Sequence, residues 1–298
     1  MTADSSASPS FLARHEFLLR RLHSLCGIIP VGAYMCVHLL TNASVLNSSA
    51  IFQRLVYQIH SLEGALPVVE WAFIFLPLLF HAIFGVVIIR SGLPNSSTYK
   101  YTNNVRYTLQ RATGMIAFAF IMWHVFHMHG WIHAEWWEKI AHGLGGAQFK
   151  PYNAASTAGA AMQSNIVVPV LYAIGVLSCV FHLANGIWTF GITWGILVSP
   201  ASQRWANYAC AGFGVALAFV GLSAIGGFYK VDLKEARQAE EKMYDAKLAS
   251  GEIGPSPHKR ADDEDVKTSG DARHAAAPIA DKPVANKPAA HAPDAAKE

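Results

Sequence analysis

Residues 166–190 read IVVPVLYAIGVLSCVFHLANGIWTF and hold no Asp, Glu, Lys or Arg. A helix needs roughly 20 predominantly apolar residues to cross about 30 Å of hydrocarbon, and this stretch is long enough to do so. Strands of a membrane barrel are about half that length and alternate in polarity. Because backbone groups in lipid must be satisfied within helices or closed barrels, the stretch predicts a transmembrane helix.

Further stretches of the same kind predict an all-α integral membrane protein, a bundle of five transmembrane helices. The other four lie at 21–42, 70–90 (entered from Pro67), 111–135 and 204–230. Residues 133–165 would form a sizeable loop between the third and fourth helices. We therefore expect residues 1–229 to form one five-helix transmembrane domain.

The charged residues are divided unevenly along the 298 residues. Residues 1–229 hold 11 Lys/Arg and 6 Asp/Glu, whereas residues 230–298 hold 12 and 14. The second part is therefore a polar tail, in which 230–248 has the pattern of a charged helical extension. Residues 249–298 are rich in Ala, Pro and Lys and cannot bury a core, so we expect them to be disordered. A net charge of +3 gives no case for binding nucleic acid.

The basic residues in the short loops predict the orientation of the bundle. With the N-terminus in the cytoplasm, eight Lys/Arg fall on the cytoplasmic side, and only Arg54, Lys139 and Lys150 fall outside. Cytoplasmic loops carry the excess of Lys and Arg, so this orientation is favoured. Five helices then place the C-terminus outside.

Four of the five stretches each contain one deeply placed histidine, namely His38, His81, His124 and His182. An ionisable or metal-ligating side chain at bilayer depth is costly, so it indicates function by default. A single such histidine is explained as well by a hydrogen bond between helices. One in each of four helices predicts two bis-histidine metal sites, and haem is the metal carrier that suits such sites.

Topology sorts the four histidines into two pairs. At a rise of about 1.5 Å per residue, His38 and His124 lie in the outer half of the membrane, and His81 and His182 in the inner half. We therefore expect the axial pairs His38/His124 and His81/His182, each from two parallel helices, so that four helices enclose two haems. Glycines in these helices would let a macrocycle approach the backbone, although ordinary helix packing explains any one of them.

The segments around these histidines resemble the dihaem cytochrome b subunit of succinate dehydrogenase, the single-chain five-helix type. The motifs occur in order over roughly residues 14–229 and are specific together, whereas the chain after about 230 has no counterpart. They are RRLHSL at 20–25, PVG at 30–32, HL at 38–39, FLPLLFHA at 75–82, LQR at 109–111, TG at 113–114, WHV at 123–125, GVLS at 175–178, FH at 181–182, NG at 185–186 and TWG at 193–195.

The resemblance implies a membrane anchor in the bacterial cytoplasmic membrane that docks a flavoprotein and an iron–sulfur subunit. Electrons would pass from the iron–sulfur subunit through two haems b to a quinone, with menaquinone the expected type. The axial ligands of the family fall on the four deep histidines. This chain would hold the haems and a quinone site but no succinate site, and so act as a subunit of succinate:quinone oxidoreductase.

Glu63 matches the position of a carboxylate tied to quinone protonation in the family, although a solvated loop residue is the plain alternative. Six further histidines are interfacial or quinone-site candidates, namely His23, His60, His127, His129, His133 and His142. Arg20, Arg21 and Arg111 could pair with haem propionates or with the partner subunit, or could simply anchor the cytoplasmic side.

Three other functions remain compatible with the sequence. The same haems would serve the cytochrome b subunit of a formate dehydrogenase or a hydrogenase. A fumarate reductase would run the reaction in reverse, but Val180 stands where some fumarate-reducing members carry a glutamate, which favours succinate oxidation. A haem-free transporter with a polar interior is disfavoured, because no Asp or Glu lies deep within a predicted span.

Overall fold

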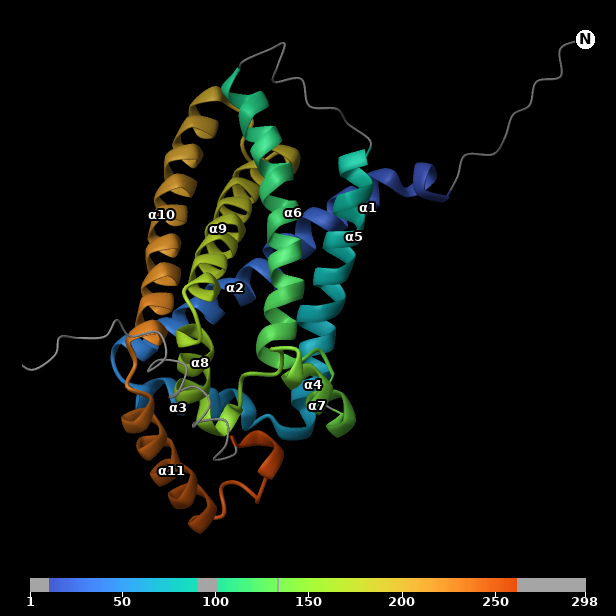
Figure 1. Cartoon of the computed structure of the whole chain (residues 1–298). Helices are drawn as coiled ribbons and strands as arrows, with labels where there is room; N and C mark the ends of the chain where they lie inside the picture. Colours follow the sequence, from blue (N-terminus) through green and yellow to red (C-terminus); the bar gives the residue numbers. More distant parts are fainter. Residues whose placement is uncertain (1–10, 91–100, 133, 262–298) are drawn as a thin grey trace, which may run out of the picture.

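A computed structural model describes residues 11–90, 101–132 and 134–261 of the chain, and this part is helical with no strand. Figure 1 shows the long helices side by side, with shorter helices gathered at one end. The α-helices are α1 (Phe11–Ile28), α2 (Pro30–Ala43), α3 (Ser49–His60), α4 (Leu66–Glu70), α5 (Leu76–Arg90), α6 (Thr102–His129), α7 (Glu135–Gly143), α8 (Ala154–Gln163), α9 (Val167–Thr193), α10 (Pro200–Lys230) and α11 (Leu233–Ala249). Short turns of other helix types are η1 (Ser44–Leu46), η2 (Glu63–Ala65), η3 (Trp71–Phe75), η4 (Pro151–Asn153) and η5 (Pro257–Lys259).

Prolines interrupt two of the predicted spans. Pro30 has no N–H to donate, and the first span is divided there into α1 and α2. The second span starts with Pro67 in the first turn of α4, as expected, and then passes through the π-helical turn η3 into α5. Pro77 is the second residue after that turn, and a widened turn accommodates the lost hydrogen bond.

Four segments of the described chain are long and apolar enough to cross a membrane: 14–46, 63–90, 167–193 and 200–230. The remaining predicted span corresponds to α6. At 28 residues α6 is long enough to cross, but Arg106, Arg111 and three histidines lower its hydropathy. The structure therefore supports a helical membrane protein with four clear candidate spans, and α6 packs among them.

Large apolar side chains remain exposed on the outside of the bundle. On α10, Val215 is 72% exposed and Phe219 is 73% exposed. A water-soluble protein rarely leaves such side chains in a continuous exposed surface, whereas lipid accepts them. The exposed face of α10 is consistent with contact to hydrocarbon.

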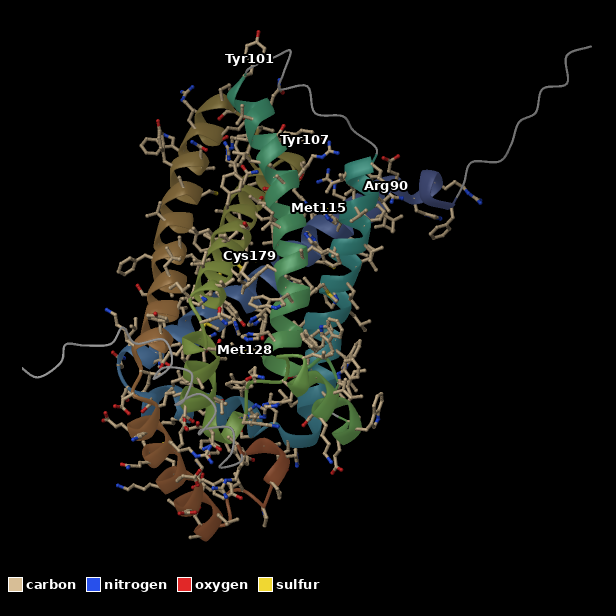
Figure 2. All side chains as sticks on the ribbon, in the orientation of Figure 1. Arg90, Tyr101, Tyr107, Met115, Met128 and Cys179 are labelled. Carbon is tan, nitrogen blue, oxygen red and sulfur yellow. The ribbon has the colours of Figure 1, made fainter. Side chains whose placement is uncertain are left out.

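The bundle has two distinct ends. Figure 2 places Arg90 and Tyr101 at one end and Met128 towards the other, so α5 and α6 run in opposite directions. The end at which α10 finishes, with α3, α7, α8 and α11, is called here the C-terminal end, and the other is the opposite end. Helix α9 packs against α6 and α10, while α1 contacts α5 and α9 and α2 contacts α10. Helices α1 and α2 therefore cross the bundle obliquely.

The predicted loop 133–165 contains two helices, α7 and α8, and α8 is among the most buried elements of the protein. Ala154 and Ala155 are fully buried and pack with Phe52 of α3, Phe228 of α10 and Ala236 of α11. Small side chains let these helices approach closely, which explains why the Ala-rich segment is buried instead of lying in solvent.

The charged segment 230–248 forms the predicted helix, α11, which ends at Ala249. The chain beyond it is ordered further than expected. Residues 249–261 are described, and Ala261 is buried against the protein. The predicted disorder of the rest of the tail, 262–298, lies outside the described residues.

Candidate functional site

A cavity of about 1320 Å³ runs through the bundle, and all four deep histidines line it. Single small-molecule sites occupy about 300–1,000 Å³, so this cavity has room for more than one ligand. Its walls are mostly apolar, and helices α1, α2, α5, α6 and α9 contribute to them together with residues of α3, α4, α8 and α10. The four helical segments that carry the deep histidines therefore surround one continuous space.

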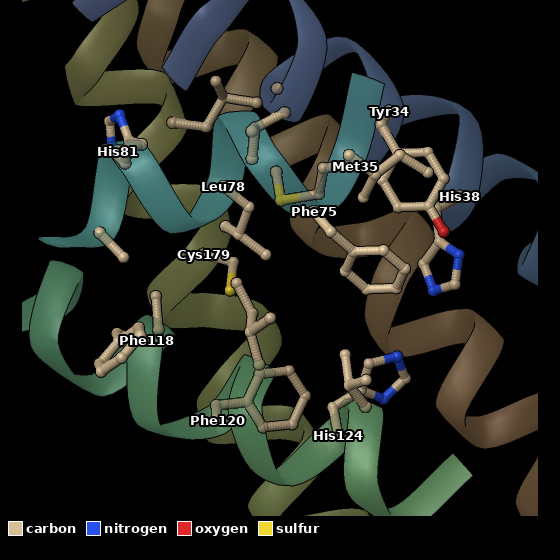
Figure 3. Close-up of a pocket in the computed structure, with 18 of the residues that line it drawn as sticks. Tyr34, Met35, His38, Phe75, Leu78, His81, Phe118, Phe120, His124 and Cys179 are labelled. Atoms are coloured by element: carbon tan, nitrogen blue, oxygen red, sulfur yellow. The ribbon is translucent and has the colours of Figure 1, made fainter. Parts of the chain in front are cut away.

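The structure brings the histidines together in the two pairs expected from their depth. The ring centroids of His38 and His124 are 5.8 Å apart, and those of His81 and His182 are 6.0 Å apart. In Figure 3 His38 and His124 lie close together, while His81 lies well away from them on its own side of the cavity. The pairs thus occupy two levels of the cavity.

The spacing within each pair suits a metal ion between two imidazoles. An ion held about 2 Å from a nitrogen of each ring leaves the two centroids roughly 6 Å apart. In the part of the chain that the structure describes, no three His, Cys, Asp or Glu side chains cluster in a way that could hold a metal. A bound group can supply the remaining ligands of an ion in either pair, and a flat macrocycle such as haem supplies four.

Backbone carbonyl groups orient the rings of the His81/His182 pair. The Nδ1 atom of His81 donates to the carbonyl oxygen of His23 at 2.9 Å, and that of His182 donates to the carbonyl oxygen of Gln110 at 3.0 Å. A carbonyl oxygen only accepts, so the proton sits on Nδ1 and the lone pair is on Nε2. This is the usual arrangement around a metal-bound histidine. In His182 the Gln110 side-chain amide nitrogen lies 3.5 Å from the Nε2 atom.

Two glycines make room for these same rings. A Cβ atom on Gly27 would lie 2.7 Å from Nδ1 of His81, and one on Gly114 would lie 2.7 Å from Cε1 of His182. Both distances are far below ordinary contact, so neither position accepts a larger residue without movement of the ring. At these two positions the glycines admit the histidine side chains, whereas the sequence suggested close approach of a macrocycle.

A polar network at the opposite end supports His182. Arg106 donates to Asn185 Oδ1 at 2.6 and 2.9 Å and lies 3.9 Å above the Trp188 ring. Asn185 in turn donates to the side chain of Gln110, which also donates to the carbonyl oxygen of His182. In the sequence Arg106 stands out only as a positive charge near a loop, because its partner Asn185 lies 79 residues away.

A tyrosine that the sequence did not single out supports the other pair. The Tyr172 hydroxyl lies 3.1 Å from Nδ1 of His124 and 2.9 Å from Nδ1 of His127. A hydroxyl carries one proton and two lone pairs, so it can serve both rings at once. His127 also stacks on Trp123 with centroids 4.9 Å apart. His127, an interfacial or quinone-site candidate, is therefore buried in a network around His124.

The three candidate arginines line the cavity but have protein partners. Arg20 pairs with Glu16, Arg21 lies over the Trp194 ring at 5.2 Å, and Arg111 donates to the Tyr107 hydroxyl. Their positive charges remain near the opposite end of the cavity, where they can meet an anionic group.

Glu63 lines the same cavity at the C-terminal end. Its φ angle is +43°, in the left-handed region that residues other than glycine rarely adopt. Such conformations are concentrated at functional sites. Of the remaining quinone-site candidates, His23, His60 and His129 all line the cavity, and His23 also stacks on His81. His133 lies outside the described residues.

A bundle of apolar helices around a cavity with two facing histidine pairs has the architecture of a membrane cytochrome b. The chain is 38% identical over 213 residues to the succinate dehydrogenase cytochrome b558 subunit of Bacillus subtilis (strain 168), a match that covers 72% of this chain and 97% of the relative. No family model matches the chain. The chain belongs to the family of succinate dehydrogenase cytochrome b subunits. This membership agrees with the resemblance found in the sequence motifs and favours it over the alternative partners.

Proposed function

We propose that this chain anchors a succinate dehydrogenase in the bacterial cytoplasmic membrane and conducts electrons through two haems b to a quinone. The proposal rests on the two facing histidine pairs at two levels of one cavity. His38 and His124 would ligate one haem iron, and His81 and His182 the other. Each iron would supply one-electron redox chemistry, and the protein would fix its position and surroundings.

The supporting groups differ between the two proposed haem sites. Backbone carbonyl groups hold His81 and His182, whereas a tyrosine hydroxyl contacts His124. Hydrogen bonds to a ligand imidazole tune the electron density that the ligand gives to the metal. The two haems would therefore have different reduction potentials.

The two ends of the cavity suit two different tasks. Arg20, Arg21 and Arg111 at the opposite end would meet haem propionates or the iron–sulfur subunit, which docks there with the flavoprotein. Glu63 at the C-terminal end would exchange protons with a quinone, for which menaquinone is the expected type. With the N-terminus in the cytoplasm, electrons would travel outward, and α6 would be the fifth membrane span.

The test is purification of the complete complex in mild detergent, followed by redox difference spectra and identification of its subunits. We expect about two haems b per chain, reducible by succinate, together with a flavoprotein and an iron–sulfur protein. The variants His182→Ala and His38→Ala should each remove a different haem, while His15→Ala, outside the cavity, should retain both. A complex without haem, or loss of the same haem in both variants, would refute the proposal.

A further inference from the structure

The chain continues beyond α10 and folds back against the C-terminal end of the bundle. Residues 231–261, called here the C-terminal arm, contain α11 and the turn η5. Figure 1 shows the arm beneath α3, α7 and α8, with its last part turning back towards the bundle. The course of the arm brings residues far apart in sequence to the mouth of the cavity.

A buried carboxylate fixes the middle of the arm. Glu240 is fully buried and accepts from the backbone N–H groups of Ala155 at 2.7 Å and Ser156 at 3.0 Å. The Ser156 hydroxyl donates to its other oxygen at 2.5 Å. These donors lie at the N-terminus of α8, where a negative charge is favourable. The arm is therefore attached to the bundle by specific polar contacts.

Asn153 organises the end of the arm. Its Oδ1 accepts from the N–H of Ala261 at 3.0 Å, and its Nδ2 donates to Glu241 at 3.2 Å. Glu241 also forms an ion pair with Arg260, whose guanidinium lies 4.3 Å above the Tyr244 ring. These contacts hold residues 260 and 261 in place and thereby fix the turn immediately before them.

That turn forms part of the cavity wall. His258 and Lys259 line the cavity, and Lys259 Nζ lies 5.5 Å above the ring of Tyr152. Lys150 lines it too, donating to the carbonyl oxygen of His258 at 3.5 Å and pairing with Glu138 at 3.6 Å. Polar groups of both charge signs thus gather at one end of a mostly apolar cavity.

We propose that the C-terminal arm completes the quinone site, with His258 and Lys259 contacting the quinone headgroup opposite Glu63. This inference rests on the proposed function. A quinone carbonyl oxygen accepts hydrogen bonds, which a lysine ammonium group donates and an imidazole N–H can donate. Its isoprenoid tail requires the apolar wall that continues into the bundle.

The reaction at such a site balances without a further reactant. One quinone takes up two electrons, delivered from succinate through this chain, and two protons, giving one quinol. Carboxylates such as Glu63 at the solvent end can pass protons in from water. The arm would donate hydrogen bonds to the headgroup and limit its contact with water.

The experiment uses the full complex and dimethylnaphthoquinone as a menaquinone-like probe. Equilibrium binding of the probe is measured alongside the rate of haem reduction by succinate, which does not require the quinone site. The test variants are the double substitution His258→Ala with Lys259→Ala, and Arg260→Ala, which releases the end of the arm. Lys242→Ala is the matched control, because Lys242 is exposed on α11 and does not line the cavity.

We expect the dissociation constant for the probe to rise about three- to tenfold in both test variants, the effect of losing a typical hydrogen bond. It should stay unchanged in Lys242→Ala, and haem reduction should stay unchanged throughout. Unchanged probe binding in all variants would overturn the role of the arm while leaving the proposed function intact. Failure of succinate to reduce haem in the parent complex would overturn the proposed function and, with it, the role of the arm.

Discussion

Replacing Gly27 by alanine would test how His81 is held. The added Cβ would lie 2.7 Å from Nδ1 of His81 and nearer still to Cε1. Ordinary contacts between such atoms are about 3.5–4.0 Å, so the ring must move by about 1 Å. Metal–ligand distances tolerate only about 0.2 Å. The movement would also break the hydrogen bond from His81 to the carbonyl oxygen of His23.

Two opposing contributions decide how Gly27→Ala changes the stability of the protein. Overpacking costs about 1–3 kcal/mol. Alanine favours a helix over glycine by about 1 kcal/mol, which partly offsets that cost. We therefore expect a helix bundle that still folds but has lost one proposed haem. Gly226→Ala is the control, because a Cβ there meets no atom within 4 Å.

The assay is the haem content per chain of the purified complex, with redox spectra to identify the haem that remains. In the Gly27→Ala complex the haem content per chain should fall from about two to one. The remaining haem should be that of the His38/His124 pair. Gly226→Ala should keep two. A Gly27→Ala complex with both haems and unchanged spectra would refute the argument that this glycine seats a ligand ring.

Three further predictions concern the groups around the site. Tyr172→Phe removes the hydroxyl beside His124. A redox titration should therefore show a shifted potential only for the haem of the His38/His124 pair. Equal shifts in both haems would contradict this prediction. Asn185→Leu leaves Arg106 without its main acceptor. Chemical denaturation should therefore show that the free energy of unfolding falls by about 1–3 kcal/mol. An unchanged denaturation midpoint would exclude the network as a stabilising element. For Glu240, burial raises the pKa above its usual 4.5, so the folded protein holds that proton more tightly than the unfolded chain does. Stability should therefore fall as the pH rises from about 4.5 through the raised pKa. Glu240→Gln should remove that dependence in thermal unfolding, and an identical pH profile for the two proteins would count against it.

The helical bundle and the histidine pairs could be predicted because the membrane limits the choices. A segment in lipid must be a helix that crosses completely, so residue position along the chain gives depth. Depth alone matched His38 with His124 and His81 with His182, and these are the rings that the structure brings together. The deep histidines also stood out by chemistry, since few side chains are so costly in hydrocarbon.

Depth does not determine how a helix is rotated about its axis. Rotation decides that Gly27 faces His81 and that Tyr172 reaches both His124 and His127, and packing between helices sets it. Hydropathy likewise could not identify α8 as a buried element, because its alanines are buried only through the helices that surround them.

The sequence by itself determined the helical membrane class, the approximate spans and the depth of each candidate ligand, because these follow from local composition and the thickness of a bilayer. Only the tertiary structure decided which backbone carbonyls orient the rings and that the C-terminal arm returns to the cavity. The bonds between Glu240 and the start of α8 join residues 84 and 85 positions apart. Contacts over such separations depend on how the whole chain packs, and no local pattern encodes them.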